Sequence, residues 1–323
     1  MTHELAELAR FLGTSAAAPV AATRIDRLAA PEVATATDMS FYLPGIHPRY
    51  AIETSAALAV LVGPADSGGV PAGRALIVDD VAMAVARVAS WVDIVRTRAA
   101  RPDARAGIAD DASIARSSVV GRGVTIGPGS RIGDGVVIGP GVSVGSYSSI
   151  GAGSIIGGYA RLGNRVHVGA GVVVGEDGFA FLADGEQWLR VPSFGSVTIE
   201  DDVELLAHVV IHAGVFSDTV IGRGCVLDSH VLIGHDARVG ARTAIAGQSA
   251  VAGAASIGRG CRIGGKSAIG EGVTIADGVT LAAMSLVTRS IAEPGAAYAS
   301  SWPAQASRTW WRQVARLKRL RSR

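Results

Sequence analysis

Residues 124–175 read VTIGPG SRIGDG VVIGPG VSVGSY SSIGAG SIIGGY ARLGNR VHVGAG VVVG when they are written in blocks of six. Each block has an aliphatic residue at its third position and glycine at its fourth. A period of six fits neither the 3.6-residue period of a helix nor the two-residue period of a strand, so it indicates a repeat architecture. The count extends from Ile108 to Val174, and we predict that it resumes after one interruption at Val197, Val203, Val209, Val215 and Ile221 and continues to Val287.

The remaining positions of the repeat predict its shape. The residue two places before each aliphatic position is small or branched, as in Val124, Ser130 and Ala160, and would fill a narrow interior. Glycine at the fourth position suits a corner, because it accepts positive φ and close packing. We therefore expect a mainly β fold in which short strands stack about 4.8 Å apart as a parallel β-helix, over residues 101–290, with three hexads to a coil.

Residues 1–100 lack the six-residue period and are predicted to form a separate α/β domain. LAELARFL (5–12) and VAMAVARVASWVDIV (81–95) have helical spacing, while ALAVLVG (57–63) and RALIVDD (74–80) indicate buried strands. Between them, FYLPGIHPRY (41–50) is either a packed turn or a ligand-binding loop, with Phe41 and Tyr50 as candidate contacts. RTRAARPDARAG (96–107) is predicted to be a polar linker.

Two further segments leave the repeat. The predicted loop at 176–196 contains Asp177, Phe179 and Trp188 in a chain with only 5% aromatic residues, and an exposed aromatic loop usually covers a ligand or a neighbouring subunit. Residues 291–323 are predicted to form an exit segment and a short helix with Ser307 as its N-cap. This helix is either a solvated face or a docking site for an acidic protein, because it carries seven basic residues and no acid: Arg308, Arg312, Arg316, Lys318, Arg319, Arg321 and Arg323.

Composition narrows the class of protein. A net charge of +2 without a recognition motif argues against nucleic-acid binding. The N-terminal residues MTHELAELARFL lack the basic start and apolar core of a secretory signal, and no apolar run is long enough to span a bilayer, so we expect a cytoplasmic protein. Cys225 and Cys261 lie two predicted coils apart, about 10 Å, and are predicted to be core thiols beyond disulfide reach.

Histidine is concentrated in the second half of the repeat, at His208, His212, His230 and His235. With eighteen residues to a coil, we predict that His212, His230 and Gln248 stack in one column. A second column is predicted to contain Ser217, His235, Gly253 and Glu271.

The His235 column predicts acyl transfer. His235 follows Gly234 at a corner, beside Asp236, and a neutral imidazole there can accept a proton from an attacking amine or hydroxyl. One coil further, the backbone N–H of Gly253 can stabilise the oxyanion that forms when a thioester carbonyl is attacked, an effect of about 3 kcal/mol. The sequence thus predicts His235 as general base and Gly253 as oxyanion donor.

Several motifs around these residues resemble the UDP-3-O-acylglucosamine N-acyltransferases of the lipid A pathway, in the hexapeptide acyltransferase superfamily. The resemblance covers nearly the whole chain and includes PRY (48–50), GEDGFAF (175–181), QWLRVP (187–192), SDTVIGRGCVLD (217–228), IGHDARVG (233–240), AIAGQSAVAG (244–253) and YASSWPAQASRTWWR (298–312). It implies a left-handed β-helix, a homotrimer with active sites between subunits, and transfer of a hydroxyacyl chain from acyl carrier protein to the 2-amine of a UDP-linked acylated glucosamine.

The resemblance also assigns residues. Tyr50 would stack on uracil, and the basic C-terminal helix would bind the acidic carrier protein. No separate cofactor is expected, because phosphopantetheine arrives on the carrier protein, and no metal is expected either. The substrate would be bound by residues of several segments, namely Phe41, Tyr50, Asp177, Phe179, His212, Asp228, Ser229, His230 and Asp236.

The chain departs from the family pattern near these residues. The family has Asp-Arg at His212 and Ala213, Asp-Asn at Asp228 and Ser229, and Ala-His-Asn at Gly234, His235 and Asp236. A second family histidine falls on Gly272, and a polar residue is replaced by Leu232. These changes indicate a different substrate pair or a paralogue of the pathway enzyme.

Two other classes of function remain open at this point. The spacing of His230 and His235, with His212 one coil earlier, is similar to that of the metal-dependent hydratases of the γ-carbonic anhydrase class, although the position of the corner glycine differs. A non-catalytic trimer that binds sugar nucleotide or carrier protein is the other alternative.

Overall fold

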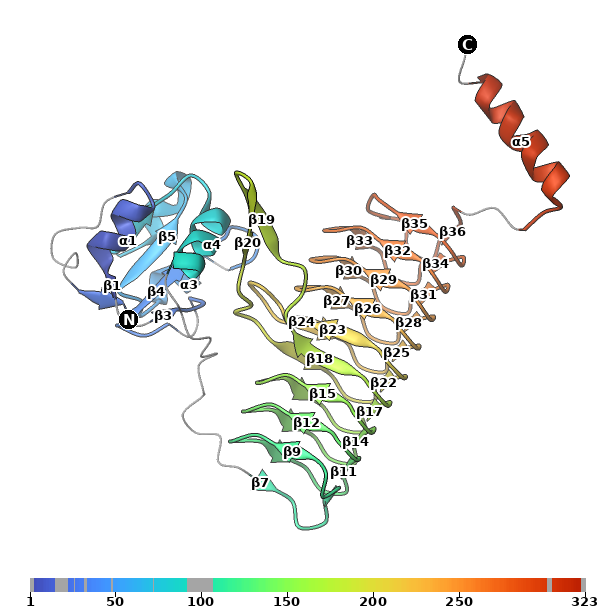
Figure 1. Cartoon of the computed structure of the whole chain (residues 1–323), viewed down its shortest axis with the longest axis horizontal. Helices are drawn as coiled ribbons and strands as arrows, with labels where there is room; N and C mark the ends of the chain where they lie inside the picture. The colour runs from blue at the N-terminus through green and yellow to red at the C-terminus, as the bar shows by residue number, and fades with distance from the viewer. Residues whose placement is uncertain are drawn as a thin grey trace.

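A three-sided prism forms the body of the molecule, with an N-terminal unit packed on one of its corners and a C-terminal helix beyond its last coil (Figure 1). The computed structural model describes residues 3–14, 23–25, 27–31, 34–47, 49–71, 73–91, 107–300 and 304–320. The predicted linker at 96–107 lies outside these ranges except for Gly107, as do Pro48, Arg321 and Arg323.

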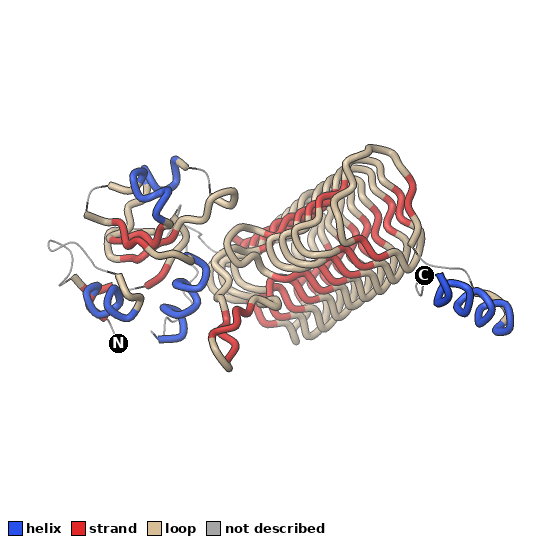
Figure 2. Tube along the Cα trace, turned by 90° about the horizontal axis from the view of Figure 1, so that it is seen from above, coloured by secondary structure: helices blue, strands red, loops and turns tan. Residues whose placement is uncertain are grey.

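The prism has three parallel sheets, and each coil contributes one strand to each sheet (Figure 2). Face 1 contains β7 (Gly107–Ile108), β10 (Thr125–Ile126), β13 (Ser143–Val144), β16 (Arg161–Leu162), β21 (Val197–Ile199), β24 (Thr219–Ile221), β27 (Arg238–Val239), β30 (Ser256–Ile257) and β33 (Thr274–Ile275). Face 2 contains β8 (Ser113–Ile114), β11 (Arg131–Ile132), β14 (Ser149–Ile150), β17 (His167–Val168), β22 (Glu204–Leu205), β25 (Val226–Leu227), β28 (Ala244–Ile245), β31 (Arg262–Ile263), β34 (Thr280–Leu281) and β36 (Ala297–Tyr298). Face 3 contains β9 (Val119–Val120), β12 (Val137–Ile138), β15 (Ile155–Ile156), β18 (Val173–Glu176), β23 (Val210–His212), β26 (Leu232–Ile233), β29 (Ala250–Val251), β32 (Ala268–Ile269) and β35 (Leu286–Val287).

The core of the prism contains the inward aliphatic residues that set the six-residue period. The small inward positions between them are often polar but satisfied, because their hydroxyls donate to corner carbonyls one coil further on, as Ser148 does to Gly163 at 3.0 Å. Cys225 and Cys261 occupy the same kind of position, and their thiols donate to Gly240 and Ala276. Both cysteines are buried and free, which confirms the prediction of two core thiols.

The hexad register predicted after the interruption is wrong by two residues. Leu162 pairs with Ile199, Val168 with Leu205 and Val174 with Ile211, so Val197, Val203 and Val209 occupy the small inward positions instead. A second insertion, residues 213–218, then separates β23 from β24 and contains Val215. The predicted count was two residues early before this insertion. The inward residues Ile211 and Ile221 on either side of it are four residues further apart than one hexad, so the two deviations add up to six and the period appeared unbroken.

Both insertions leave the prism at the corner between face 3 and face 1, which we call the loop corner. The first, predicted as a loop at 176–196, contains an antiparallel hairpin of β19 (Phe181–Asp184) and β20 (Gln187–Arg190). The second follows β23 one coil later. Residues 213–218 form no strand of their own, so other groups must hold them in place.

The N-terminal unit is an α/β structure built on a parallel sheet in the order β3-β4-β5-β6. Its elements agree with the predicted helices and strands: β1 (His3–Glu4), α1 (Leu5–Phe11), β2 (Arg24–Ile25), β3 (Arg27–Leu28), β4 (Asp38–Phe41), α3 (Tyr50–Thr54), β5 (Ala59–Val62), a 3-10 helix (Pro64–Gly69), β6 (Ala75–Ile77) and α4 (Val81–Trp91).

The N-terminal unit is held on the loop corner by both insertions. Its apolar core includes Leu189 and Val191 of the first insertion and Val215 of the second. Arg87 of α4 binds the hairpin residue Asp184 through two hydrogen bonds of 2.7 and 3.1 Å. Such bidentate pairs are geometrically specific, so the hairpin fixes the orientation of α4.

The chain ends in α5 (Ser307–Leu320), which extends away from the prism (Figure 1). The predicted C-terminal helix is therefore present. Every helix in the described ranges is too short or too polar to cross a bilayer.

Candidate functional site

His235 lies at the loop corner directly after β26, as the hexad count predicts. Its Nδ1 is 2.8 Å from Oδ2 of Asp236, and its side chain is 19% exposed. Because the carboxylate can only accept, Nδ1 carries the proton and Nε2 of a neutral imidazole keeps its lone pair. The geometry thus presents Nε2 as the basic atom.

Asp236 is the most highly hydrogen-bonded side chain of this corner. Besides His235, it accepts bonds from the backbone N–H groups of Val215, Phe216 and Ser217, at 2.9, 3.0 and 2.6 Å, and from the Ser217 hydroxyl. Burial would raise the pKa of Asp236, but the bonds from His235 and from the second insertion together hold it below its ordinary value. The carboxylate therefore stays ionised beside the imidazole.

Gly253 lies one coil beyond His235, as predicted. A Cβ at this position would be 2.6 Å from both Nε2 and Cε1 of His235, so the imidazole rests directly against the glycine. No acceptor in the described part of the chain takes a hydrogen bond from the Gly253 N–H. The predicted base and the predicted oxyanion donor thus lie side by side.

Gly253→Ala is expected to displace the His235 ring, because a real Cβ essentially never lies 2.6 Å from a ring atom. With His235 as the predicted base, this displacement should lower kcat for the predicted acyl transfer by about a hundredfold or more. Steady-state kinetics check this result. Gly63→Ala is the matched control, since a Cβ there meets nothing within 4 Å. Equal activity of the two variants would contradict the placement of Gly253 in the site.

His212 also lies at the loop corner, at the end of β23 and one coil before His235. Burial, followed by the nearby charge of His235, lowers the pKa of His212, and Asp177 opposes this shift. A Cβ on Gly178 would be 2.7 Å from Nδ1 of His212, so the start of the first insertion packs directly on this imidazole. His212 therefore lines the same corner as the base.

The predicted column is wrong for His212 but correct for His230 and Gln248, which lie one coil apart at equivalent positions of the prism. His230 instead stacks on His208, with ring centroids 5.1 Å apart and an interplanar angle of 13°, at the corner between face 2 and face 3. We call this the His208 corner. The second insertion, between His212 and His230, displaced His212 from the eighteen-residue count, which is why it was misassigned.

The predicted substrate-binding residues Asp228 and Ser229 lie at the His208 corner as well. Asp228 accepts bonds from the N–H groups of Gly247 and Ser229, at 2.8 and 2.7 Å. Within one chain, the predicted site residues are therefore divided between two corners on either side of face 3. No group of three or more His, Cys, Asp or Glu side chains among the described residues is placed to hold a metal ion.

The first insertion supplies the other predicted residues at the loop corner. Asp177 is largely buried and lies 3.6 Å from Arg190, whose guanidinium is 4.7 Å from the Phe181 ring centroid. Phe179 is 77% exposed. An exposed phenylalanine beside His212 and Asp177 is available to a ligand or to a neighbouring subunit.

The structure corrects the prediction for Phe41 and leaves Tyr50 as a candidate. Phe41 is fully buried and packs between Phe194 and Phe216, at 4.7 and 5.5 Å, so its ring joins the N-terminal unit to both insertions and is closed to a ligand. Tyr50 begins α3 and is 63% exposed. Its ring is free to stack on a planar group.

The predicted carrier-binding residues Arg308, Arg312, Arg316 and Arg319 are exposed on α5, which also contains Lys318. Arg319 has an interaction elsewhere in the chain, and the side chain of Lys318 lies outside the described part.

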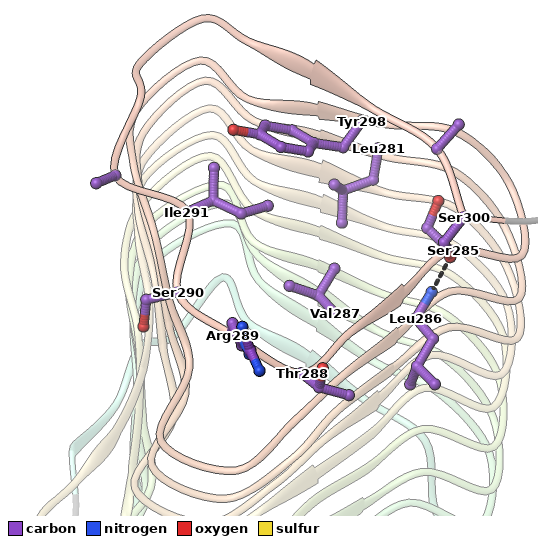
Figure 3. Close-up of a pocket in the computed structure, with 12 residues that line it drawn as sticks. Leu281, Ser285, Leu286, Val287, Thr288, Arg289, Ser290, Ile291, Tyr298 and Ser300 are labelled. Atoms are coloured by element: carbon purple, nitrogen blue, oxygen red, sulfur yellow. Dashed lines mark hydrogen bonds between the residues drawn. The ribbon is translucent and has the colours of Figure 1, made fainter.

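A cavity of about 330 Å³ lies elsewhere, at the open end of the last coil (Figure 3). Its walls include Leu281, Val287, Ile291 and Tyr298. It is three coils beyond His235 by the strand order of face 3, so it is separate from the site at the loop corner.

Comparison with known proteins places the chain in a family. Hexapeptide repeats of bacterial transferases match residues 117–151, and the hexapeptide repeat of succinyl-transferase matches residues 141–176 and 254–289. The UDP-3-O-acylglucosamine N-acyltransferase of Pseudomonas syringae pv. tomato is 38% identical over 99% of this chain and 92% of that protein. The same-named protein of Pseudomonas fluorescens strain Pf0-1 is 41% identical with the same coverage. The chain belongs to the UDP-3-O-acylglucosamine N-acyltransferase family.

This member of the acyltransferase family is thus an acyltransferase with the predicted left-handed parallel β-helix of hexapeptide repeats. A solved UDP-N-acetylglucosamine O-acyltransferase from Moraxella catarrhalis is 24% identical, with a TM-score of 0.37 over 64% of this chain and 77% of that one.

Two positions where this acyltransferase departs from the family pattern lie in open surroundings. Leu232, three residues before His235 on face 3, is 38% exposed. Gly272 lies at the loop corner, and a Cβ there would meet nothing within 4 Å. The surroundings of position 272 are therefore open within the described part of the chain.

Sequence reasoning missed the main role of Asp236 and the whole of the second insertion. It treated Asp236 only as a substrate contact. Three of its five hydrogen-bond donors are backbone groups of residues 215–217, which an unbroken hexad count placed inside the prism. The signal that could have found the insertion is Phe216, because the unbroken count places this large ring at the fourth position of a hexad, where the repeat before the interruption has glycine.

Proposed function

We propose that this protein transfers a hydroxyacyl chain from acyl carrier protein to the 2-amine of a UDP-linked acylated glucosamine, in lipid A biosynthesis. The observation that carries the proposal is the pair His235 and Asp236, with the ring of His235 resting against Gly253, in a chain of this acyltransferase family. The relatives' name supplies the nucleotide sugar acceptor. A thioester on a carrier protein is the donor that the general base and the oxyanion donor suit.

The proposed reaction uses His235 twice. Nε2 accepts a proton from the acceptor amine as its nitrogen attacks the thioester carbonyl, and the Gly253 N–H binds the oxyanion that forms. The tetrahedral intermediate then collapses, the carbon–sulfur bond breaks, and the imidazolium returns its proton to the departing thiolate. Asp236 holds Nδ1 throughout and stabilises the charged imidazolium, because its carboxylate stays ionised.

A homotrimer is supported by the outer surface of face 3. In every strand of this sheet the residue directly before the inward aliphatic one is apolar, and we call the set the apolar stripe: Val119, Val137, Ile155, Val173, Val210, Leu232, Ala250, Ala268 and Leu286. Val119 is 60% exposed and Leu286 is 62% exposed. Outward residues of the other two faces are largely polar, so the apolar stripe is the surface that suits burial against copies of this chain.

Threefold packing on the apolar stripe would also reunite the divided site. The loop corner and the His208 corner flank face 3, so rotation about a threefold axis brings the loop corner of one protomer beside the His208 corner of the next. His235 and the segment from Asp228 to His230 lie in neighbouring hexads and hence at the same height along the prism. Each proposed active site would then combine the base of one subunit with the substrate-binding residues of another.

The remaining predicted contacts fit the same scheme. The exposed ring of Tyr50 is proposed to stack on the uracil of the acceptor. The basic residues of α5 are proposed to bind the acidic carrier protein through charge complementarity. This interaction should weaken with salt, because it joins exposed charges.

An acceptor and donor screen tests the proposal. The purified protein is incubated with UDP-linked amino sugars and acyl carrier proteins of graded chain length, and products are measured by mass spectrometry. We expect an N-acylated product for a 3-O-acylated UDP-glucosamine and none for its N-acetylated analogue, because an amide nitrogen cannot be acylated in this way. No product with any pair would support a non-catalytic binding protein and contradict the proposed reaction.

A further inference from the structure

The carboxylate of Asp236 makes more hydrogen bonds to the second insertion than to His235. Of five donors, one is His235 Nδ1 and four belong to residues 215–217. Oδ1 accepts from the Phe216 N–H, the Ser217 N–H and the Ser217 hydroxyl, while Oδ2 accepts from the Val215 N–H and from His235. Three consecutive backbone donors thus point at one side chain.

The same insertion is part of the N-terminal unit's core. Val215 is 2% exposed and belongs to the apolar cluster of that unit. The Phe216 ring contacts Phe41 of β4, and Phe194 of the first insertion completes the aromatic group. Asp236 therefore lies between the imidazole of His235 and residues 215–217 of the second insertion. The N-terminal unit packs on these three residues, and we call them the seat of the unit.

We propose that Asp236 is a positioning residue for the N-terminal unit as well as for His235, so that one carboxylate sets the seat of the acceptor-binding unit and the orientation of the base. The base half of this inference rests on the function proposed above, whereas the seat of the N-terminal unit does not. Without the carboxylate, three part-buried N–H groups lose their acceptor, and the backbone bonds that join residues 213–215 to the first insertion, such as Phe194 N–H to the Val215 carbonyl at 2.8 Å, satisfy none of these three groups.

The N-terminal unit stays attached when this seat is loosened. Arg87 and Asp184 still join α4 to the hairpin. Asp218, at the end of the insertion, accepts a bond from the Ser196 N–H at 2.7 Å and pairs with Arg161. Loss of Asp236 should therefore loosen residues 213–217 and the adjoining part of β4 without releasing the unit.

Hydrogen exchange on the intact protein tests the structural half. In Asp236→Ala, the amides of residues 213–218 and 38–43 should exchange at least about tenfold faster than in the wild type, since they lose their shared anchor. Phe216→Ala should accelerate the same two segments. Asp277→Asn is the matched control, because Asp277 also caps a corner N–H, that of Arg259 at 2.7 Å, but contacts neither insertion. Wild-type exchange at 38–43 in Asp236→Ala would overturn the inference.

Kinetics separate the two roles. Phe216→Ala should raise KM for the nucleotide sugar about fivefold or more with kcat nearly unchanged, because only the seat is altered. Asp236→Asn should lower kcat by at least about tenfold, since its single amide oxygen cannot accept both from His235 at the Oδ2 position and from the Phe216 and Ser217 N–H groups at the Oδ1 position, and the acidic limb of its pH–rate profile should move to lower pH. An unchanged pH profile would show that Asp236 acts on the fold alone. If no substrate pair reacts, the proposed function fails, while the exchange result still decides whether Asp236 seats the unit.

Discussion

His235→Ala is expected to lower kcat for acyl transfer by about a hundredfold to ten thousandfold, the usual range for loss of a general base. The physical reason is that the Gly253 N–H only donates, while Asp236 is held ionised by five hydrogen bonds that lower its pKa and make it a weak base for the proton of the amine. Steady-state kinetics with the product measured by mass spectrometry check this value.

The matched control for His235→Ala is His167→Ala. His167 lies on the outer surface of face 2, where Nδ1 is 2.8 Å from the Ser149 hydroxyl, and is remote from the loop corner. Its removal should leave kcat within about twofold of the wild type, as is usual for surface changes. Both variants should keep the mass of the wild-type assembly in light scattering. Unchanged acyl transfer in His235→Ala would exclude this residue as the base.

Val137→Arg is expected to convert the proposed trimer into monomers and to remove most activity. Val137 is the second residue of the apolar stripe, is 41% exposed, and is four coils from His235 along face 3. Threefold symmetry would bring three copies of the introduced guanidinium close together in an apolar contact, where an unpaired charge is costly. Light scattering should show the mass of a single chain.

Ser143→Arg on face 1 is the control for the stripe. Arg161 and Arg238 already occupy outward positions of that face, so an arginine fits there without a fold defect. This variant should keep the wild-type mass and activity. A trimeric Val137→Arg protein would show that the apolar stripe is not the subunit contact. Monomers with full activity would contradict a site shared between subunits.

The period of six was enough to predict the prism, because each coil repeats the same local requirements of a buried aliphatic residue, a small neighbour and a corner. The same regularity caused the register error after Val197. Two inward positions of each hexad accept valine, so Val197 and Ile199 could not be told apart by residue type. Pairing of Leu162 with Ile199 resolves the choice, and it depends on contacts between coils.

The candidate site was predicted where the chain is regular and missed where it is not. His235 and Gly253 are separated by one uninterrupted coil, so counting placed them together correctly. His212 and His230 are separated by the second insertion, so counting failed. The buried position of Phe41 could not be read from its segment, because both rings that enclose it come from the insertions.

The sequence by itself determined the β-helix, the α/β character of the N-terminal unit, and the column that joins His235 to Gly253, because all three follow from spacing along the chain. Only the tertiary structure decided that residues 213–218 leave the prism, that Asp236 joins them to the base, and that the predicted substrate contacts lie on two corners. The physical reason is that these features depend on hydrogen bonds and packing between segments distant in sequence, which a local period does not specify.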